Sequence, residues 1–203
     1  MTATTQPVEP PGSRERILDA AIRLLRRQGY ASTGIKQIVE EGHAPLGSVY
    51  HHFPGGKEQL AIEAIETAGE RIRRTLATTG AVPDIPAAMN NYFVVHAQRL
   101  RDSGWELGCP IANVSQETAV GNEAIRAACT RVFDSWRATL SEVFVHAGVV
   151  AREADELATF VLTSYEGALT MSRAVHDVRP MIVAGAAVAS LVDSHLGDTA
   201  PAG

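Results

Sequence analysis

The sequence predicts an all-α fold with an N-terminal three-helix head and a larger C-terminal helical domain. Apolar residues recur at intervals of three and four along most of the chain, and Gly, Pro and capping residues divide this pattern into helix-sized segments. Residues 29–60 contain two short helical segments joined by a four-residue turn, which is typical of a helix-turn-helix. We therefore expect a helix-turn-helix head at residues 13–58 and a helical domain at residues 59–198. Residues 1–12 and 199–203 are expected to be disordered tails.

Three helices are expected in the head. Ser13 is a good N-cap for the first helix, and Gly29 lies where a left-handed C-terminal cap is needed. The Thr33 hydroxyl is expected to cap the second helix, which ends at Gly42. The third helix is expected over residues 45–53, because a proline at the first helical position sacrifices no hydrogen bond.

The third helix has an unusual outer face. Val49 and Phe53 are four residues apart and are expected to point inward. The residues then left nearer the outside are Leu46, Gly47, Ser48, Tyr50, His51 and His52. An exposed Tyr-His-His run is difficult to explain by packing, and Gly47 lets the helix approach another surface closely. These features suit insertion into the major groove of DNA, which is about 12 Å wide.

The head residues also form a specific motif. Gly29-Tyr30 and Thr33 come first; the residues that follow are Gly47, Tyr50, His52, Phe53 and Lys57-Glu58-Gln59-Leu60. This order resembles the TetR family of bacterial regulators, whose DNA-binding segment pairs Gly-aromatic-x-x-Thr with a Gly-x-x-Tyr-x-His-Phe recognition helix and a following Lys-Glu-x-Leu. Residues 44–60, together with Gly108-Cys109-Pro110, are similar to the branch of the family that contains LmrA and YxaF.

The resemblance implies two kinds of DNA contact. Phosphates would be held by Thr33, Tyr50, His52 and Lys57. Base edges would lie against Leu46, Gly47, Ser48 and His51. Lys36 and Pro45 complete the predicted DNA-binding set. Thr33 and Lys57 lie near expected helix N-termini, where free amides and the helix dipole favour an anion. Leu46 can touch only a thymine methyl or a sugar, so direct readout of bases is expected to be sparse.

One residue departs from the family pattern. The family usually has Gly at the turn position that His43 occupies, and here Gly42 comes one place earlier. Histidine tolerates a left-handed backbone better than most residues, though less well than glycine. We expect a slightly altered turn in which His43 is a solvated residue without a functional role.

The charge of the chain is unevenly distributed. The net charge is −5, but residues 1–58 carry seven Lys or Arg against six Asp or Glu, a net +1. Residues 59–203 carry eleven against seventeen, a net −6. The acidic residues therefore lie away from the proposed groove helix. Because a net charge of +1 gives only a weak positive field, DNA affinity is expected to depend on specific contacts and on two heads acting together.

The C-terminal domain is expected to be helical throughout. A connecting helix should end near Gly80; the later helices are expected at Asp84–Asp102, Pro110–Thr118, Asn122–Gly148, Arg152–Val175 and Pro180–Leu196. The last two are apolar on more than one side, and such a helix usually has two partners. By the resemblance they would form a four-helix bundle with a second copy of the chain. The alternative is a larger monomer core.

A ligand cavity is expected in the middle of the chain. Its predicted lining is Phe93, His96, Trp105, Asn113, Gln116, Trp136, Tyr165 and Glu166. Most combine an apolar body with one polar tip, a lining that orients a mostly hydrophobic small molecule. As alternatives, Trp136 would be a core residue, His96 a satisfied core or surface histidine, and Asn113 and Gln116 would face solvent. Glu166 is a candidate partner for a cationic ligand, with pairing to Arg173 or Arg137 as the alternative.

Other classes of function find little support. The sequence has no nucleophile elbow, zinc-protease motif, phosphate-binding loop or dinucleotide fingerprint, so neither catalysis nor a cofactor is expected. No metal site is expected, because the adjacent His51 and His52 diverge on a helix. Cys109 and Cys129 are expected to be buried and reduced. No signal peptide is evident and Met181–Val192 is too short to span a bilayer, so a cytoplasmic protein with no membrane partner is expected.

The observations together predict a homodimeric transcriptional regulator. It would bind double-stranded DNA at an inverted-repeat operator, act as a repressor, and be released by a small hydrophobic or aromatic effector. Two alternatives remain. One is a DNA-binding activator or a regulator with no effector, and the other is a helical ligand-binding or catalytic protein whose head no longer binds DNA.

Overall fold

The computed structural model describes residues 12–118 and 121–197, and these residues form nine α-helices. The helices are α1 (Ser13–Gln28), α2 (Ile35–Glu41), α3 (Leu46–His52), α4 (Gly56–Thr79), α5 (Ile85–Asp102), α6 (Pro110–Thr118), α7 (Glu123–His146), α8 (Ala151–Val175) and α9 (Arg179–Gly197). The predicted all-α class is confirmed. The predicted tails lie outside the described residues, except that Gly12 precedes α1.

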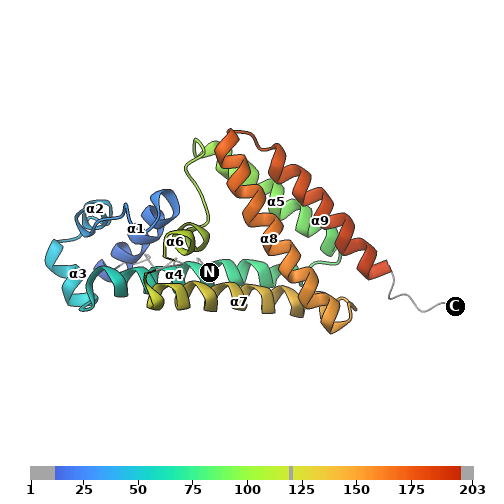
Figure 1. Ribbon diagram of the computed structural model, residues 1–203, viewed down its shortest axis with the longest axis horizontal. Coiled ribbons are helices and arrows are strands. Elements are labelled where there is room, and N and C mark those ends of the chain that lie inside the picture. The colour runs from blue at the N-terminus through green and yellow to red at the C-terminus, as the bar shows by residue number, and fades with distance from the viewer. Residues whose placement is uncertain (1–11, 119–120, 198–203) are drawn as a thin grey trace, which may run out of the picture.

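The helices form two regions joined by long helices (Figure 1). The short helices α1, α2 and α3 lie at one end, and α5, α8 and α9 lie at the other. Between them α4 and α7 run side by side, and α6 packs against α1, α4 and α7. Because α4 begins in the head and continues to Thr79, the predicted boundary between residues 58 and 59 falls inside one continuous helix. Within the described residues, no helix is both long enough and apolar enough to cross a membrane.

Two helix starts follow local capping rules. The Asp84 carboxylate accepts a hydrogen bond from the Ala87 amide (2.9 Å) at the start of α5. The Asn122 side chain accepts one from the Ile125 amide (2.9 Å) at the start of α7. Side-chain caps of this kind contribute about 1 kcal/mol each. The expected starts at Asp84 and Asn122 are therefore confirmed.

Two other predicted caps are wrong. The N-caps of α1 and α2 are Gly12 and Gly34, and neither helix start has a side-chain cap. The Ser13 hydroxyl bonds instead to Nε2 of His52 (2.7 Å), and the buried Thr33 hydroxyl donates to the Gly29 carbonyl (2.6 Å). Both side chains are thus used for contacts within the head that the local sequence does not reveal.

Close helix contacts hold the C-terminal domain together. Gly69 of α4 faces Val132 of α7 so closely that an added Cβ would lie 2.6 Å from a valine methyl. Gly185 of α9 lies equally close to Phe93 of α5, where an added Cβ would lie 2.7 Å from the phenylalanine Cβ. Small residues are needed at both crossings because the backbones approach directly.

Candidate nucleic-acid interface and ligand cavity

The turn between α2 and α3 is set by His43. Its φ is 46°, which is the left-handed region that a helix-terminating turn requires. The His43 amide donates to Glu40 O (3.2 Å) and the Ala44 amide donates to Val39 O (2.9 Å), so the last carbonyls of α2 are satisfied. The expectation that histidine adopts the left-handed turn is confirmed, and His43 is solvent-exposed as expected.

The α3 helix divides into an inner and an outer face. Val49 and Phe53 are fully buried, as predicted. Leu46 and Tyr50 lie one turn apart on the other side and are 47% and 55% exposed. A short helix that presents a leucine and a tyrosine to solvent gains less from them in folding than from buried residues, because about half of their surface stays in contact with water. An exposed face of this kind indicates a contact surface.

The other predicted DNA-binding residues differ in exposure. The exposed ones are Lys36, Pro45, Leu46, Gly47, Tyr50 and His51. The half-buried ones are Ser48, His52 and Lys57. Thr33 is buried and its hydroxyl is bonded to Gly29 O, so it presents no side-chain donor at the surface.

Two of the half-buried residues are held in place by neighbours. His52 is bonded to Ser13, as described above. The Lys57 ammonium lies 4.3 Å from the centre of the Tyr30 ring, in a cation–π contact. Burial lowers the pKa of Lys57, and the Glu117 charge acts in the opposite direction. These contacts order both side chains before any partner binds.

A cavity of about 50 Å³ lies between the helices of the larger domain. Its lining comes from six helices and one loop. These residues are Arg26 of α1, Ile72 and Leu76 of α4, Met89, Tyr92, Phe93 and His96 of α5, Gly108 and Cys109 of the loop, Pro110 of α6, Trp136 and Leu140 of α7, and Val161, Leu162, Tyr165, Glu166 and Leu169 of α8. One ordered water needs roughly 10–15 Å³ of such space, so the cavity as it stands has room for a few waters, and a larger ligand has to widen it.

Aromatic rings cluster around Tyr165 at this cavity. The ring centres of Tyr92, Phe93 and His96 lie 5.4, 5.3 and 5.7 Å from that of Tyr165. His96 Nδ1 lies 2.8 Å from the Tyr92 carbonyl, so this nitrogen carries the proton and donates. Burial lowers the pKa of His96, which favours its neutral form, and burial raises the pKa of Tyr165. The aromatic cluster of these four residues is therefore uncharged near neutral pH.

Glu166 places an acid beside the aromatic cluster. The residue keeps some exposed surface, but burial of its carboxyl raises the pKa of Glu166 to about 7. A hydrogen bond with the Cys109 thiol favours the carboxylate and offsets part of this effect. Burial also raises the pKa of Cys109, so the thiol stays protonated and donates. Both Cys109 and Cys129 are buried and unpaired, as expected.

The arginines suggested as partners of Glu166 lie elsewhere. Arg137 pairs with Asp155 and Asp134. Arg173 donates to the backbone carbonyls of Trp105 and Arg27. The pairing alternative is therefore wrong for both arginines.

The structure brings five of the eight predicted ligand residues together. Phe93, His96, Trp136, Tyr165 and Glu166 line the cavity. Trp136 is also a core residue, because its indole N–H donates to Gly69 O (2.8 Å). Trp105, Asn113 and Gln116 do not line the cavity, for three different reasons. Trp105 stacks on His176, Asn113 donates to Arg26 O, and Gln116 faces solvent.

Several lining residues escaped the sequence analysis. Arg26, Tyr92 and Cys109 reach the cavity from α1, α5 and the loop after α5. Tyr92 is one position before the predicted Phe93, so the α5 periodicity could have found it. No local signal indicates Arg26, because only the packing of α1 against the larger domain brings it there.

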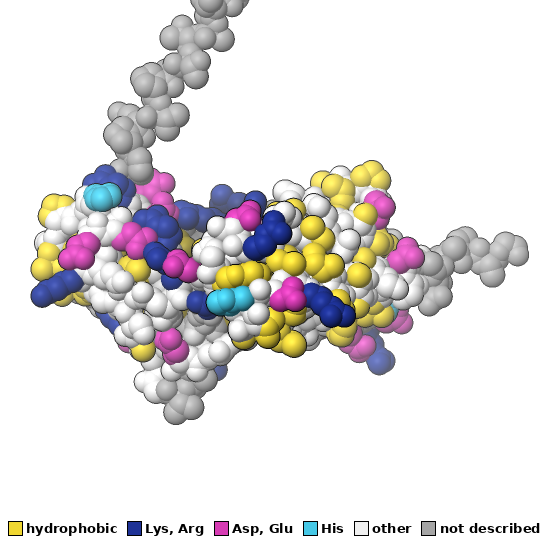
Figure 2. Space-filling view, turned by 90° about the horizontal axis from the view of Figure 1, so that it is seen from above, with side chains coloured by type: hydrophobic (Ala, Val, Ile, Leu, Met, Phe, Trp, Pro, Cys, Tyr) yellow, Lys and Arg dark blue, Asp and Glu magenta, His cyan; other side chains and the backbone are white. Residues whose placement is uncertain are grey.

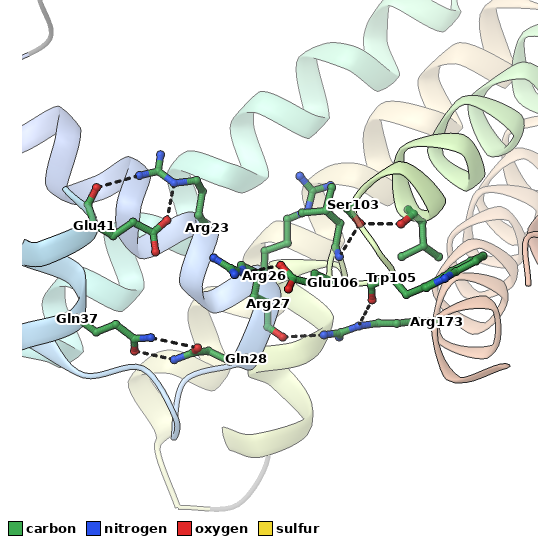
Figure 3. A network of polar contacts seen from close by, with 12 residues as sticks. Arg23, Arg26, Arg27, Gln28, Gln37, Glu41, Ser103, Trp105, Glu106 and Arg173 are labelled. Atoms are coloured by element: carbon green, nitrogen blue, oxygen red, sulfur yellow. Dashed lines mark hydrogen bonds and ion pairs between the residues drawn. The ribbon is translucent and has the colours of Figure 1, made fainter. Parts of the chain in front are cut away.

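A network of hydrogen bonds joins the end of α1 to the larger domain, and Figure 3 shows the part of it around Arg27, Trp105 and Arg173. Arg26 Nε donates to Gly108 O (2.8 Å), and the Gly108 amide and the Asn113 side chain both donate to Arg26 O. Arg173 of α8 donates to Arg27 O (2.6 Å) and to Trp105 O (3.2 Å). The last carbonyls of α1 are thus bound by residues of the larger domain, and Gly108 belongs to both the network and the cavity lining.

A second contact joins the head to α6. The Glu117 carboxylate accepts hydrogen bonds from the amides of Tyr30 and Ala31, both at 2.7 Å. Gly29, with φ of 76°, lies directly against this carboxylate, where a side chain would collide with it. The prediction that glycine is needed at position 29 is confirmed by its positive φ, but its ψ of −172° is extended and differs from that of the predicted left-handed cap.

Known protein families match both the helix-turn-helix head and the larger domain. Residues 17–64 match the family described as "Bacterial regulatory proteins, tetR family". Residues 85–187 match "Transcriptional regulator LmrA/YxaF-like, C-terminal domain". The first match covers the helix-turn-helix, and the second covers most of the cavity.

Known regulators match this chain over most of their length. The HTH-type transcriptional regulator LmrA of Bacillus subtilis is 36% identical over 171 residues, 84% of this chain and 91% of LmrA. The uncharacterized regulator YxaF of the same organism is 34% identical over 181 residues, 89% of this chain and 95% of YxaF. The crystal structure of a TetR transcriptional regulator from Chloroflexus aurantiacus has a TM-score of 0.75 at 30% identity, covering 90% of this chain and 95% of that one. The chain therefore belongs to the TetR family of bacterial DNA-binding transcriptional regulators, which are not enzymes, and to its LmrA/YxaF-like branch.

Proposed function

We propose that this regulator is a repressor that binds an inverted-repeat operator as a homodimer and leaves it when a small aromatic effector fills the cavity. The observation that carries the proposal is the outer face of α3, where Leu46 and Tyr50 are exposed on a helix whose other side is fully buried. A helix in this position of a helix-turn-helix lies in the major groove.

The proposed DNA contacts follow the exposure of the head residues. Leu46, Gly47 and His51 would face base edges, with Ser48 at the margin. Tyr50, His52, Lys57, Lys36 and Pro45 would lie along the phosphates. We leave out the Thr33 side chain, because it is buried and its hydroxyl is already bonded. Phosphate contacts fix the register of the head, while base contacts supply specificity.

The proposed dimer interface is the outer face of α8 and α9. Apolar residues on this face remain exposed in the single chain: Phe160, Met171, Val175, Ile182 and Val183. Figure 2 shows apolar side chains gathered over the part of the molecule that holds α8 and α9. An apolar surface of this kind is favourable only when covered. A second copy covers it symmetrically and places two heads on one side of a palindrome.

The proposed release mechanism uses the wall between cavity and head. Gly108 lines the cavity, and its backbone is bonded to both Nε and O of Arg26 in α1. An effector that displaces this wall changes the position of α1, and the head moves with it. The effector binds more tightly when the heads are in the displaced position than when they are on the operator. The affinity for the operator falls by the same factor.

Selection from a random duplex pool tests the DNA proposal without knowledge of the operator. Bound sequences are amplified and sequenced, and the enriched site is measured by fluorescence anisotropy over a salt series. We expect an inverted repeat, salt-sensitive binding, and a loss of about 10- to 100-fold in Tyr50→Ala. Val145→Ala is the control, because Val145 is also exposed but lies on α7. Enrichment of no sequence would refute the proposal and favour a head that no longer binds DNA.

Sedimentation of a charged variant tests the dimer. Val183 is 58% exposed, so Val183→Arg leaves the monomer fold intact but places a charge inside the proposed interface. We expect a weaker dimer by about tenfold or more, with a parallel loss of operator affinity. Val145→Arg adds the same charge on α7 and should remain dimeric. A wild type that sediments as a monomer would exclude this interface.

A further inference from the structure

The cavity has an uneven distribution of charge. Among the described residues that line it, Glu166 is the one carboxylic acid and Arg26 is the one guanidinium. The rest of the lining is aliphatic, aromatic or uncharged. A ligand that enters is therefore selected by apolar shape and by two charged side chains.

Glu166 has no strong partner at the cavity. Its hydrogen bond comes from the Cys109 thiol, which is a weak donor. Arg137 and Arg173 are engaged elsewhere. A buried carboxylate without a counter-ion is costly, so it takes up either a proton or a cation. The Glu166 carboxyl is thus an available site for a positively charged group.

The aromatic cluster supplies a second attraction for the same charge. Tyr165 adjoins Glu166 in sequence, and the rings of Tyr92 and Phe93 lie within 5.4 Å of its centre. The faces of such rings attract cations, and the effect grows when the cation loses its water. A ring on the ligand can also stack within this cluster.

Arg26 is less available than Glu166. Its Nε already donates to Gly108 O, in the network that holds α1 to the cavity wall. An anion that drew the guanidinium away from Gly108 O would break that bond, whereas a cation at Glu166 leaves it intact. Arg26 favours an anionic ligand and Glu166 favours a cationic one. Because Glu166 lacks a strong protein partner, we expect it to determine the charge of the ligand.

We propose that the effector is a small aromatic monocation, with its positive group at Glu166 and its ring among Tyr92, Phe93 and Tyr165. This assignment rests on the proposed function and names the chemical class of its effector.

Binding of such a ligand competes with a proton. Burial raises the pKa of Glu166 to about 7, and a bound cation lowers it, so a proton is released on binding. The other facing groups do not titrate in the same range. The pKa values of Tyr92, Tyr165 and Cys109 are raised and that of His96 is lowered, in each case mainly by burial. Affinity for a cation should therefore rise about tenfold from pH 6 to pH 8, as Glu166 ionises.

Three probes of similar shape test the charge alone. Phenyltrimethylammonium, tert-butylbenzene and benzenesulfonate each join a phenyl ring to a tetrahedral group that is positive, neutral or negative. Binding is followed by calorimetry and by the fluorescence of Trp136, which lines the cavity, in a Trp105→Phe background that leaves one tryptophan. We expect the cation to bind at least about tenfold more tightly than the neutral probe and to release protons.

Glu166→Gln removes the charge but keeps the shape. In this variant the advantage of the cation over the neutral probe and its pH dependence should both disappear, with circular dichroism confirming the helical fold. Glu153→Gln, on the exposed side of the same helix, should behave as the wild type. Equal binding of all probes, tighter binding of benzenesulfonate, or no cation binding at millimolar concentration would each overturn the proposal. Operator binding without any probe tests the proposed function separately.

Discussion

The head and the cavity are built in different ways. The proposed DNA-contacting residues come from one stretch, residues 36–57, and most of them stay exposed. The cavity draws its lining from α1, α4, α5, α7, α8, the start of α6 and the loop before it. A contact surface on one short helix can be predicted from the local sequence, whereas a cavity exists only after distant helices have packed.

The two regions also relate function to stability differently. On α3 the fold depends on Val49 and Phe53, while the proposed function depends on Leu46 and Tyr50 on the opposite face. Stability and binding are therefore separable there. In the cavity a single side chain, Glu166, would serve the ligand while burial opposes its charge. Stability and binding are therefore opposed there.

The largest effect should come from truncating the inner face of α3. Phe53 is fully buried, and Arg14 lies over its ring at 5.3 Å. Phe53→Ala should lower the free energy of unfolding by about 3–5 kcal/mol, measured by urea denaturation followed by circular dichroism. Tyr50→Ala, three residues earlier on the exposed face, should change it by less than about 0.5 kcal/mol. Similar losses in both variants would show that the two faces of α3 are not separable.

The next effect should be a gain of stability. The pKa of Glu166 is raised from its ordinary 4.5 to about 7 in the folded protein. The folded state thus holds more protons than the unfolded state between these values, and stability falls as pH rises from about 4.5 to 7. Glu166→Gln removes this loss. It should match the wild type near pH 4 and exceed its free energy of unfolding by about 1–3 kcal/mol at pH 8.

Thermal or urea unfolding at the two pH values measures this difference. Glu153→Gln is the control, because Glu153 is exposed on the same helix. A variant less stable than the wild type at pH 8 would mean that the carboxylate has a favourable partner in the folded protein. The opposition between stability and binding would then be wrong.

The contrast between the regions also explains what the sequence could predict. Helix bounds were predictable where a cap acts locally, as at Asp84 and Asn122. They were misjudged where a hydroxyl has a distant partner, as for Ser13 and His52. The outer face of α3 followed from the helical period alone. Trp105, Asn113 and Gln116 were placed in the cavity because polarity and size do not reveal which side of a loop or helix faces inward.

A smaller effect is expected at the joint between the two regions. The Arg173 guanidinium donates to two backbone carbonyls, one of them Arg27 O at the end of α1. Arg173→Ala leaves these carbonyls without their charged donor and should cost about 1–2 kcal/mol, since the site is only half-buried. Hydrogen exchange should become faster in the last turn of α1 while α3 is unchanged. Arg152→Ala, which removes an exposed ion pair on the same helix, should cost less than about 0.5 kcal/mol.

Unchanged exchange in α1 would show that Arg173 does not restrain the head. Among the hydrogen bonds described above, those of Asn113 and Gly108 to Arg26 would then remain between the end of α1 and the larger domain. Gly108 also lines the cavity, so in that case the proposed link from effector to head would pass through the contact between Gly108 and α1.

The smallest effect is expected where the chain departs from its family, at His43. Its φ of 46° is strained for any residue with a Cβ, and glycine removes that strain. Glycine also gives the unfolded chain more freedom, which offsets part of the gain. His43→Gly should therefore raise the free energy of unfolding by no more than about 0.5–1 kcal/mol. Since the His43 side chain is exposed and the bonds of the turn use backbone atoms, operator affinity should stay within about twofold. A large change in affinity without a change in stability would instead assign His43 a contact with DNA, and the proposed interface would then extend from α3 back into the turn.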